Sequence, residues 1–475
     1  MSVVLMDSVR AWWPEAVLSL GALLVMLLGA GKASRAALVA TWALLAAAAA
    51  ALWRTPVPPA TSLFFGLITG DPFSLAFRWL ALGSIAVTVL LVMASREIAS
   101  DARGACVGML LLLGVGLMLM AEATHLLMAY LSMELVSLSG YLLVGFLNDA
   151  RASEASLKYL LFGALASGIM LFGMSLLYGL TGALAFADLR VATAGATGPL
   201  AHALVVAVVL MVAGLAFKIS MAPFHLWTPD AYEGAPIPVA ALLSVGPKAA
   251  GLALFARLLG ALWSLWPWLA PLLLVLTVVT MTLGNVVALV QTNVKRLLAY
   301  STIGQVGYLL IGLVVHTRLG LAGLLLYLVA YLFMNLGVFA CVVAVVEATG
   351  SESLDAFRGL SARAPALAAC CAAFLLSLAG IPPLLGFLGK FLLFGSAIAA
   401  HAAWLAVAAA LNSAIALYYY INLIRLMYFA APQDAQPLRP APALRLAVGV
   451  CAAVTLGFGL FPGWLLHVLG PLTTL

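Results

Sequence analysis

Apolar runs of about 20 residues follow one another along almost the whole of this 475-residue chain. A helical run of that length matches the thickness of the hydrocarbon core of a bilayer. Hydrophobic residues make up 65% of the chain and charged residues only 8%, whereas soluble domains carry about 25% charged residues. The sequence therefore predicts an all-α polytopic membrane protein and argues against a soluble globular fold. Short strands of alternating polarity, which a β-barrel would need, do not occur.

The apolar runs divide into fourteen predicted transmembrane spans joined mostly by short loops. The predicted bounds are 15–31, 36–53, 73–95, 104–121, 124–147, 155–180, 200–230, 237–260, 268–290, 297–315, 321–347, 364–399, 403–429 and 442–470. The longest connections are rich in glycine, proline, threonine or charged residues; they are 54–72, 181–199 and 348–363. None of these connections is long enough to form a large soluble domain.

Two of the predicted spans carry prolines that should break their helices. Pro223 lies inside the seventh span, and Pro382 and Pro383 lie inside the twelfth. A proline within a helix lacks an N–H and clashes with the carbonyl four residues earlier, so it kinks or interrupts the helix. The sequence therefore predicts that the seventh and twelfth helices are broken.

The two broken spans are five spans apart, and this interval predicts an internal repeat. Interrupted helices at corresponding positions point to the repeated units that transporters use. The predicted units are three N-terminal helices in 1–100, a first five-helix repeat in 101–262, a second in 263–431, and a last helix in 432–475. Because five is odd, the second repeat enters from the opposite side and would be inverted.

Basic residues in the loops predict how the chain sits in the membrane. We call the side that holds both termini side A and the other side B. Side A has six basic residues: Arg10, Arg54, Arg78, Arg190, Arg257 and Arg318. Side B has thirteen: Lys32, Arg35, Arg96, Arg103, Arg151, Lys158, Lys295, Arg296, Arg358, Arg363, Arg425, Arg439 and Arg445. The positive-inside rule places side B in the cytoplasm and both termini outside.

Four ionisable residues fall deep within predicted spans, where they are costly. Lys218, Lys248 and Lys390 are the basic residues left after the loops are counted, and Glu134 is the one acidic residue deep in a span. Insertion scales put the cost of such a residue at a few kcal/mol, so it usually faces a bundle interior or a water-filled cavity. Four of them on spans 5, 7, 8 and 12 suggest a proton path.

Their chemistry suggests roles along that path. A nearby carboxylate favours a charged lysine and desolvation disfavours it, so a Glu134–Lys218 pair of variable spacing could switch the lysine between holding and releasing a proton. His225, just past the Pro223 break, titrates near neutral pH when unperturbed and is a further candidate. Polar residues that could hold bridging waters are Ser220, Ser244, Thr302 and Tyr308.

Structural interpretations remain open for each of these residues. Pro223 could be a packing kink, His225 a hydrogen-bonded structural histidine, and Glu134 a neutralising partner for insertion. Lys390 could extend its ammonium group to the membrane surface. The tyrosines of 418–420 are interpreted as packing and interfacial anchors. The cysteines Cys106, Cys341, Cys370, Cys371 and Cys451 lie in apolar runs without metal-ligand spacing, and there is no phosphate-binding or dinucleotide-binding glycine motif.

Five segments of the sequence resemble the antiporter-like membrane subunits of respiratory complex I. They are "MELVSLSGYLLVGF", "EASLKYLLFGALASGIMLFG", "FKISMAPFHLWTPDAYEGAPIPVAALLSVGPKAA", "QTNVKRLLAYSTIGQVGYLL" and "LSLAGIPPLLGFLGKF". The resemblance covers nearly the whole chain and is strongest to the N-type subunit of bacterial NADH–quinone oxidoreductase. The L type carries a long lateral helix after the last span, which is not expected here. The M type has a glutamate where this chain has Lys390.

The resemblance implies fourteen helices with inverted repeats of helices 4–8 and 9–13. It also implies a polar axis in which Glu134 and Lys218 form a pair, Lys248 relays protons, and Lys390 donates them toward the outside. His225 matches the histidine after the helix-7 break. The implied function is proton translocation from the cytoplasm, driven by quinone reduction in other subunits of the enzyme.

The same resemblance implies what binds elsewhere in the assembly. NADH, FMN, iron–sulfur clusters and quinone would bind to other subunits, and this chain would bind none of them. Its partners would be homologous antiporter-like subunits, small membrane subunits and lipids, with no nucleic acid, in a bacterial inner membrane. Two alternatives stay open: a subunit of an Mrp-type cation/proton antiporter, and a structural scaffold of the membrane arm that carries no protons.

Overall fold

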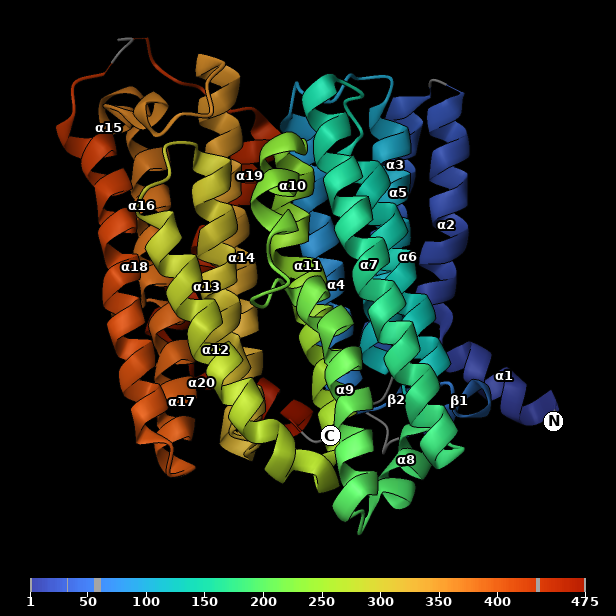
Figure 1. Ribbon diagram of the computed structural model, residues 1–475. Coiled ribbons are helices and arrows are strands. Elements are labelled where there is room, and N and C mark those ends of the chain that lie inside the picture. The colour runs from blue at the N-terminus through green and yellow to red at the C-terminus, as the bar shows by residue number, and fades with distance from the viewer. Residues whose placement is uncertain (1, 32, 55–60, 433–435, 474–475) are drawn as a thin grey trace.

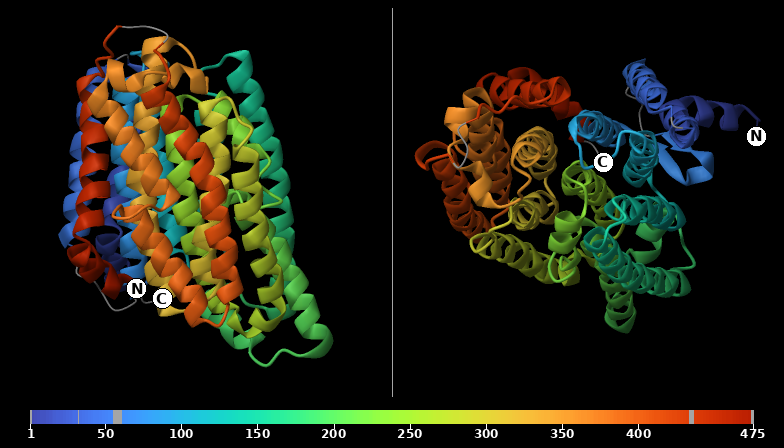
Figure 2. Two further views of the ribbon diagram at one scale, coloured as in Figure 1. Left: turned by 90° about the vertical axis from the view of Figure 1, so that its left-hand side faces the viewer. Right: turned by 90° about the horizontal axis from the view of Figure 1, so that it is seen from above.

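The computed structural model describes residues 2–31, 33–54, 61–432 and 436–473. Lys32, one of the side B charges counted above, lies outside the described residues. Most of the described chain forms long helices that run roughly parallel or antiparallel to one another (Figure 1). Both termini lie at the same end of this bundle, which we call side A as above (Figures 1 and 2).

The helices of the first half include eight long apolar helices. Their bounds, with the short helices between them, are α1 Ser2–Ala11, α2 Trp13–Ala30, α3 Ser34–Arg54, α4 Pro72–Ala94, α5 Arg103–Glu122, α6 Leu126–Val144, α7 Ala150–Thr181, α8 Phe186–Thr193, α9 Gly198–Ile219, α10 Trp227–Gly234 and α11 Ile237–Ala261. Two short strands, β1 Thr61–Leu63 and β2 Ile68–Gly70, form an antiparallel hairpin around the 3₁₀ turn η1 Phe64–Gly66.

The second half continues in the same manner. Its helices are α12 Trp266–Ala288, α13 Val294–Val314, α14 Arg318–Thr349, α15 Leu360–Arg363, α16 Pro365–Ala379, α17 Leu385–Ala399, α18 Ala403–Phe429, α19 Pro442–Leu460 and α20 Gly463–Leu469. Three further 3₁₀ turns are η2 Trp263–Leu265, η3 Leu354–Phe357 and η4 Gly470–Thr473. Within the described ranges, thirteen helices are long and apolar enough to cross a membrane. With α16 and α17 counted as one broken helix, they match the fourteen predicted spans.

The prolines break the two helices, as predicted. Pro223 lies in the non-helical segment 220–226 between α9 and α10, and Pro382 and Pro383 lie between α16 and α17. The seventh span divides unevenly, because α9 has 22 residues and α10 only eight. The inverted five-helix repeat that these breaks suggested stays a prediction.

Three details differ from the sequence prediction. The connection 54–72 contains the β1–β2 hairpin, and the connection 181–199 contains α8. The fourteenth span ends at Leu460, because Pro462 interrupts it before α20. Arg78 and Arg257, counted above as loop residues, instead lie buried within α4 and α11.

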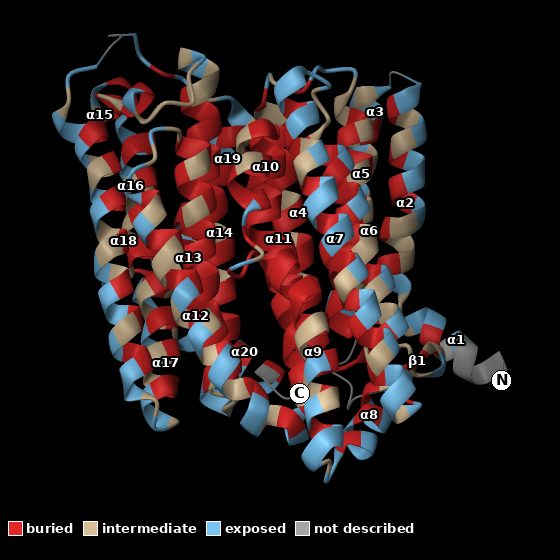
Figure 3. Cartoon of the chain, in the orientation of Figure 1, coloured by how far each residue is buried: buried red, intermediate tan, exposed pale blue. Residues whose placement is uncertain are grey.

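The centre of the bundle is formed by α4, α11, α13 and α14, which pack against one another. Figure 3 shows these helices as largely buried, whereas the outer helices expose one face. Nearly every residue of α11 is buried, including polar ones. Seen from above, the first-half and second-half helices lie to either side of this centre (Figure 2). Polar groups near the middle of these four helices are therefore mostly enclosed by the surrounding helices.

Close packing of α12 against α13 depends on glycines, and this yields a test. A Cβ on Gly307 would lie 2.6 Å from the backbone nitrogen of Met281. We expect Gly307→Val to force the two helices apart, at a cost of about 1–3 kcal/mol. The measurement is the temperature at which the chain aggregates in membrane extracts. Gly168→Val is the control, because no atom lies within 4 Å of its added Cβ; equal losses in both variants would contradict the packing argument.

Candidate functional site

Three lysine side chains are buried inside the bundle on three different helices. Lys218 lies in the last turn of α9, Lys248 near the middle of α11, and Lys390 within α17. Their exposed fractions are 1%, 0% and 3%. Burying an ammonium group is costly unless it is paired or hydrogen-bonded, so the neighbours of each lysine indicate how the fold tolerates it.

Lys218 and Glu134 lie near each other but are not in contact. The Lys218 Nζ donates to the Ser137 hydroxyl at 2.5 Å, while Glu134 accepts a hydrogen bond from the Ser167 hydroxyl. Ser137 follows Glu134 by three residues on α6, so both lie on one face of that helix. In this structure the predicted pair makes no direct ion pair, because each member bonds to a different serine, Lys218 to Ser137 and Glu134 to Ser167.

Lys248 is the least satisfied of the three lysines. Its Nζ has no hydrogen-bond partner among the described residues. It lies 4.6 Å from the centroid of the Trp227 ring and 5.4 Å from that of the Tyr232 ring, both on α10. Such ring faces attract a cation, but they do not replace hydrogen bonds. The Tyr232 hydroxyl is also unpartnered, so two buried polar groups here lack partners in the described chain.

Lys390 lies at the second helix break and is well partnered. Its Nζ donates to the Ala379 carbonyl at 3.2 Å and to the Ser413 hydroxyl at 2.7 Å. It also lies 4.2 Å from the centroid of the Tyr308 ring. Ala379 is the last residue of α16, and its carbonyl is one of those that a helix end leaves without an intrahelical partner. The break therefore supplies the acceptor that holds the lysine inside, and Lys390 does not reach the surface.

The first break holds His225 and a serine in an unusual conformation. Ser220 has φ 63°, a left-handed conformation that ends α9, and its hydroxyl accepts from Thr228 at 2.7 Å. His225 is 6% exposed, and its Nδ1 has no partner among the described residues. Residues 220–226 thus bring a titratable group next to a helix end, as the sequence suggested.

A series of uncharged polar side chains lies between the helices of Lys248 and Lys390. Beginning on α11, the Ser244 hydroxyl accepts from the Asn335 amide of α14 at 2.6 Å. On α13, Thr302 accepts from the Tyr331 hydroxyl at 2.9 Å. Each of these hydroxyls already has a side-chain partner, and whether they also bridge waters stays a prediction.

Gln305 is the centre of this polar series, and sequence reasoning missed it. Its amide donates to the Tyr420 hydroxyl at 3.1 Å and to the Leu378 carbonyl at 3.2 Å, and its carbonyl accepts from Tyr327. Leu378 directly precedes the residue whose carbonyl holds Lys390. A glutamine near the middle of a predicted span was the available signal.

The tyrosines of α18 also take part. The Tyr420 hydroxyl lies 2.5 Å from that of Ser301, and the Tyr419 hydroxyl donates to Asn285. Asn285 in turn donates to the Tyr308 hydroxyl at 2.9 Å. Tyr308 thus belongs to the polar series, and whether it bridges a water stays a prediction. Tyr419 and Tyr420 make buried hydrogen bonds in addition to packing, which the sequence interpretation did not include.

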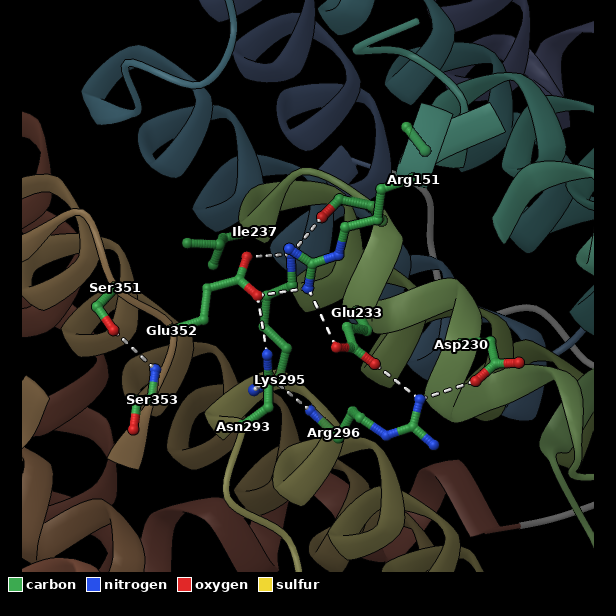
Figure 4. A network of polar contacts seen from close by, with 12 residues as sticks. Arg151, Asp230, Glu233, Ile237, Asn293, Lys295, Arg296, Ser351, Glu352 and Ser353 are labelled. Carbon is green, nitrogen blue, oxygen red and sulfur yellow. Dashed lines mark hydrogen bonds and ion pairs between the residues drawn. The ribbon is translucent and has the colours of Figure 1, made fainter. Parts of the chain in front are cut away.

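A charged groove opens on side B of the bundle, above α10. Two adjoining cavities of about 700 and 220 Å³ share the lining residues Arg151 and Glu233. Figure 4 shows the ion pairs that cross the larger part of this groove. Eight charged side chains form one connected network there, and they are Arg151, Glu154, Lys158, Asp230, Glu233, Lys295, Arg296 and Glu352.

The short helix α10 connects this groove to Lys248. Asp230 and Glu233 on α10 contact Arg296 of α13 at 2.8 and 2.7 Å. The same eight-residue helix carries the Trp227 and Tyr232 rings that cover Lys248. One helix therefore carries both the acidic groups of the groove and the aromatic cover of the central lysine.

Two carboxyl groups of the network have lowered pKa values. Burial alone would raise the pKa of Glu352, but Lys295 at 2.8 Å together with bonds from Asn293 and Arg151 outweighs it and lowers that pKa below the usual 4.5. Asp230 shows the same balance, since Arg296 and Lys158 lower its pKa below 3.8 despite burial. Both groups are therefore ionised at neutral pH.

These lowered values predict how acid affects the groove. A carboxyl whose pKa is lowered in the folded state stabilises that state above its unfolded pKa and loses this effect as the pH falls through the folded value. We expect the wild-type protein to lose thermal stability below about pH 4.5. We expect Glu352→Gln to be about 1 kcal/mol less stable at neutral pH and to lose less on acidification. Unfolding temperature against pH measures both effects.

The matched control is Glu154→Gln, because that side chain is 68% exposed and pairs with Lys158 one turn away. We expect its stability to follow the wild type at every pH. An acid profile of Glu352→Gln that matched the wild type would show that this carboxyl does not hold the groove together.

No group of three or more His, Cys, Asp or Glu side chains that could hold a metal ion occurs in the part of the chain that the structure describes. The five cysteines are free.

Comparison with known proteins shows to which family this chain is similar. Residues 123–416 match the family described as NADH:quinone oxidoreductase/Mrp antiporter, TM. The chain is 43% identical to NADH-quinone oxidoreductase subunit N of Anaeromyxobacter sp. (strain Fw109-5), over 94% of this chain and 93% of that one. It is 42% identical to NAD(P)H-quinone oxidoreductase subunit 2 of Microcystis aeruginosa, over 89% of this chain and 83% of that one.

Solved structures give the same picture. A chain of respiratory complex I from Thermus thermophilus superposes with a TM-score of 0.80 at 33% identity, over 96% of this chain and 98% of that one. A chain of the Mrp complex from Dietzia sp. DQ12-45-1b superposes with a TM-score of 0.85 at 22% identity, over 98% and 97%, a likeness of fold alone. This multi-pass membrane chain belongs to the NADH:quinone oxidoreductase/Mrp antiporter membrane family.

Proposed function

We propose that this chain is a proton-translocating, N-type membrane subunit of NADH–quinone oxidoreductase. It would lie in a bacterial cytoplasmic membrane with both termini outside and would move protons from the cytoplasm outward. NADH, FMN, the iron–sulfur clusters and quinone would bind to other subunits of the enzyme. Its partners would be homologous antiporter-like subunits, small membrane subunits and lipids. The 43% identity to an N subunit over nearly the whole chain supports this assignment.

The observation that carries the proposal is the set of three buried lysines with polar side chains between them. Lys248 and Lys390 lie on helices between which Asn335, Tyr331 and Gln305 make side-chain hydrogen bonds. A merely structural lysine would be expected to have a fixed partner. Lys248 has none in the described chain, so its surroundings leave it free to exchange a proton with a neighbouring group or an entering water.

The geometry supports a role for each residue. Protons would enter from the groove on side B, pass α10 to Lys248, and continue along α13 to Lys390, which would release them toward side A. Glu134 and Lys218 would act as a pair of variable spacing, and a change in the hydrogen bond from Lys218 to Ser137 would change how strongly Lys218 holds its proton. His225 would exchange protons at the first break between α9 and α10.

The energy would come from quinone reduction in other subunits, because the proposal assigns no redox centre to this chain. An Mrp-type antiporter subunit remains the alternative, since the Mrp chain shares the fold. The Anaeromyxobacter and Microcystis relatives, both above 40% identity, carry quinone oxidoreductase names, which favours the oxidoreductase subunit. A scaffold that moves no protons is the other alternative, and the following variants separate it from a relay.

The first test replaces Lys248 by methionine in the assembled enzyme within native membranes. Because methionine cannot carry a proton, we expect NADH–quinone turnover and proton pumping to fall together by at least about tenfold. Assembly, checked by native gel, should persist, because removing an unpartnered buried charge leaves no other charge unpaired. Turnover and pumping are recorded on the same membranes.

Two control variants sharpen this test. Lys248→Arg keeps the positive charge, but a guanidinium does not release a proton in proteins, so we expect it to be as inactive as Lys248→Met. Leu252→Met tests whether a methionine is tolerated at another buried site on α11, and it should be fully active. Normal pumping in Lys248→Arg would mean that only charge is needed, and the relay role would be wrong.

The second test interrupts the polar series at its centre. Gln305→Leu removes the amide that contacts Tyr327, Tyr420 and the Leu378 carbonyl. We expect slower pumping with the lysines intact, together with a stability loss of about 1–3 kcal/mol from the buried groups left unpaired. Gln305→Glu keeps an acceptor for Tyr327 and can carry a proton, so it should recover part of the pumping rate. Equal pumping in Gln305→Leu and wild type would rule out a route through this residue.

A further inference from the structure

A second group of buried charges lies at the side A end of the bundle, apart from the lysines. It consists of Glu15 on α2, Asp71 just before α4, Arg78 on α4, Glu122 at the end of α5 and Arg257 on α11. All five side chains are buried. We call this group the side A cluster; neither the proposed proton path nor the loop charges of the sequence prediction account for it.

Four of the five residues pair closely. Arg78 donates from Nε to Oε1 of Glu15 and from Nη2 to Oε2, each at 2.6 Å. This is the bidentate geometry of a strong pair. Arg257 donates to Asp71 at 2.7 Å and to the Ala121 carbonyl at 2.6 Å. The carboxylate of Asp71 also accepts from the backbone N–H of Ser74. These contacts use the two positive charges of the cluster.

The carboxyl group of Glu122 has few partners of its own. Its Oε1 lies 3.1 Å from Arg78 Nε, an atom that already donates to Glu15 at a shorter distance. Its Oε2 has no hydrogen-bond partner in the described chain. The charged groups around it are Glu15 from α2, Arg78 and Asp71 from α4 and its cap, and Arg257 from α11. Three carboxyl groups therefore share two guanidinium groups.

This imbalance has a chemical consequence. An ionised carboxylate that is buried without a full partner is so costly that it takes up a proton instead. When two carboxyl groups share one site, one of them holds the proton. Glu15 has the better geometry for the charged form, and Glu122, with one oxygen unpartnered, is the group that the proton neutralises.

The β1–β2 hairpin lies next to Glu122 at the side A end of the bundle (Figure 1). Ile68 of β2 pairs with Ala123, the residue after Glu122, and Thr124 donates to the Gly66 carbonyl. On the other face of the hairpin turn, Phe65 is 74% exposed. We infer that a proton leaving Glu122 would reach the side A solution past this hairpin. Along α11, by contrast, the residues between Lys248 and Arg257 are apolar or glycine.

We propose that Glu122 holds a proton at neutral pH and exchanges it with the side A solution, so that the side A cluster is a proton-release site distinct from the three buried lysines. The protonated carboxyl keeps the cluster neutral while Arg78 stays paired with Glu15. Losing that proton places the negative charge beside Arg78. That Glu122 holds a proton does not depend on the proposed function. That Glu122 releases this proton during turnover rests on the proposed function.

The protonation state is tested by comparing wild type with Glu122→Gln, which mimics the neutral carboxyl. A free glutamate titrates near pH 4.3, so above that value the unfolded wild-type chain has lost a proton that the folded chain still holds. The unfolding equilibrium of wild type relative to the variant should then shift tenfold toward unfolding for each pH unit between about 5 and 7. No relative shift over this range would show that folded Glu122 is ionised and would overturn the proposal.

The exchange is tested on the assembled enzyme in native membranes. We expect Glu122→Gln to assemble but to pump fewer protons per NADH oxidised, and Glu122→Asp to restore part of the loss. Asp188→Asn, an exposed side A carboxyl on α8, is the control and should pump normally. Normal pumping in Glu122→Gln would overturn the release role. A pumping loss there, combined with normal pumping in Lys248→Met, would contradict only the lysine relay.

Discussion

The structure depends on how charged side chains are held where lipid and protein exclude water. A helix end offers carbonyls without intrahelical partners, and its dipole attracts a cation. At the second break, the last carbonyl of α16 accepts a hydrogen bond from Lys390. At the first break, Lys218 occupies a similar position in the last turn of α9. The second break therefore supplies an acceptor for Lys390, whereas Lys218 bonds to Ser137 on α6. Lys248, on an unbroken helix, has aromatic rings around it and no acceptor among the described residues.

The position of α10 links the surface to this interior. Its acidic residues are paired with Arg296 of α13 and Arg151 of α7, so the helix is held by charges from both halves of the chain. Its rings lie against Lys248 on the other side. A displacement of α10 by a few ångströms would alter the ion pairs of the groove and the cover of the lysine together. A coupling claim of this kind requires two states of the element, and α10 is the element in which they should be sought.

The sequence predicted the parts of this arrangement that depend on one-dimensional patterns. Apolar run lengths gave the fourteen crossings, and Pro223, Pro382 and Pro383 gave the breaks. The rarity of charge at bilayer depth singled out Lys218, Lys248 and Lys390, which the structure finds buried. What could not be predicted depends on which helices become neighbours. Ser137 contacts Lys218 from 81 residues away, and Gln305 and Tyr420 meet across 115 residues. Arg78 and Arg257 lie close enough to span ends to resemble loop charges, and only the packing of α2, α5 and the hairpin buries them.

The two charged groups at opposite ends of the bundle differ in a way that bears on their chemistry. The side B network pairs four basic with four acidic residues, and most of these side chains are partly exposed. Lys295, which is buried, is paired with Glu352 at 2.8 Å, so every carboxyl group of this network has a basic partner. The side A cluster is buried and has one carboxyl group too many. A carboxylate that is paired with a basic group near water stays ionised at neutral pH. A buried carboxyl group without a full basic partner takes up a proton instead. The same kinds of side chain thus form a charge-balanced, partly exposed network at one end of the bundle and a buried cluster with one carboxyl group in excess at the other. The proposed movement of protons from side B to side A would use this asymmetry.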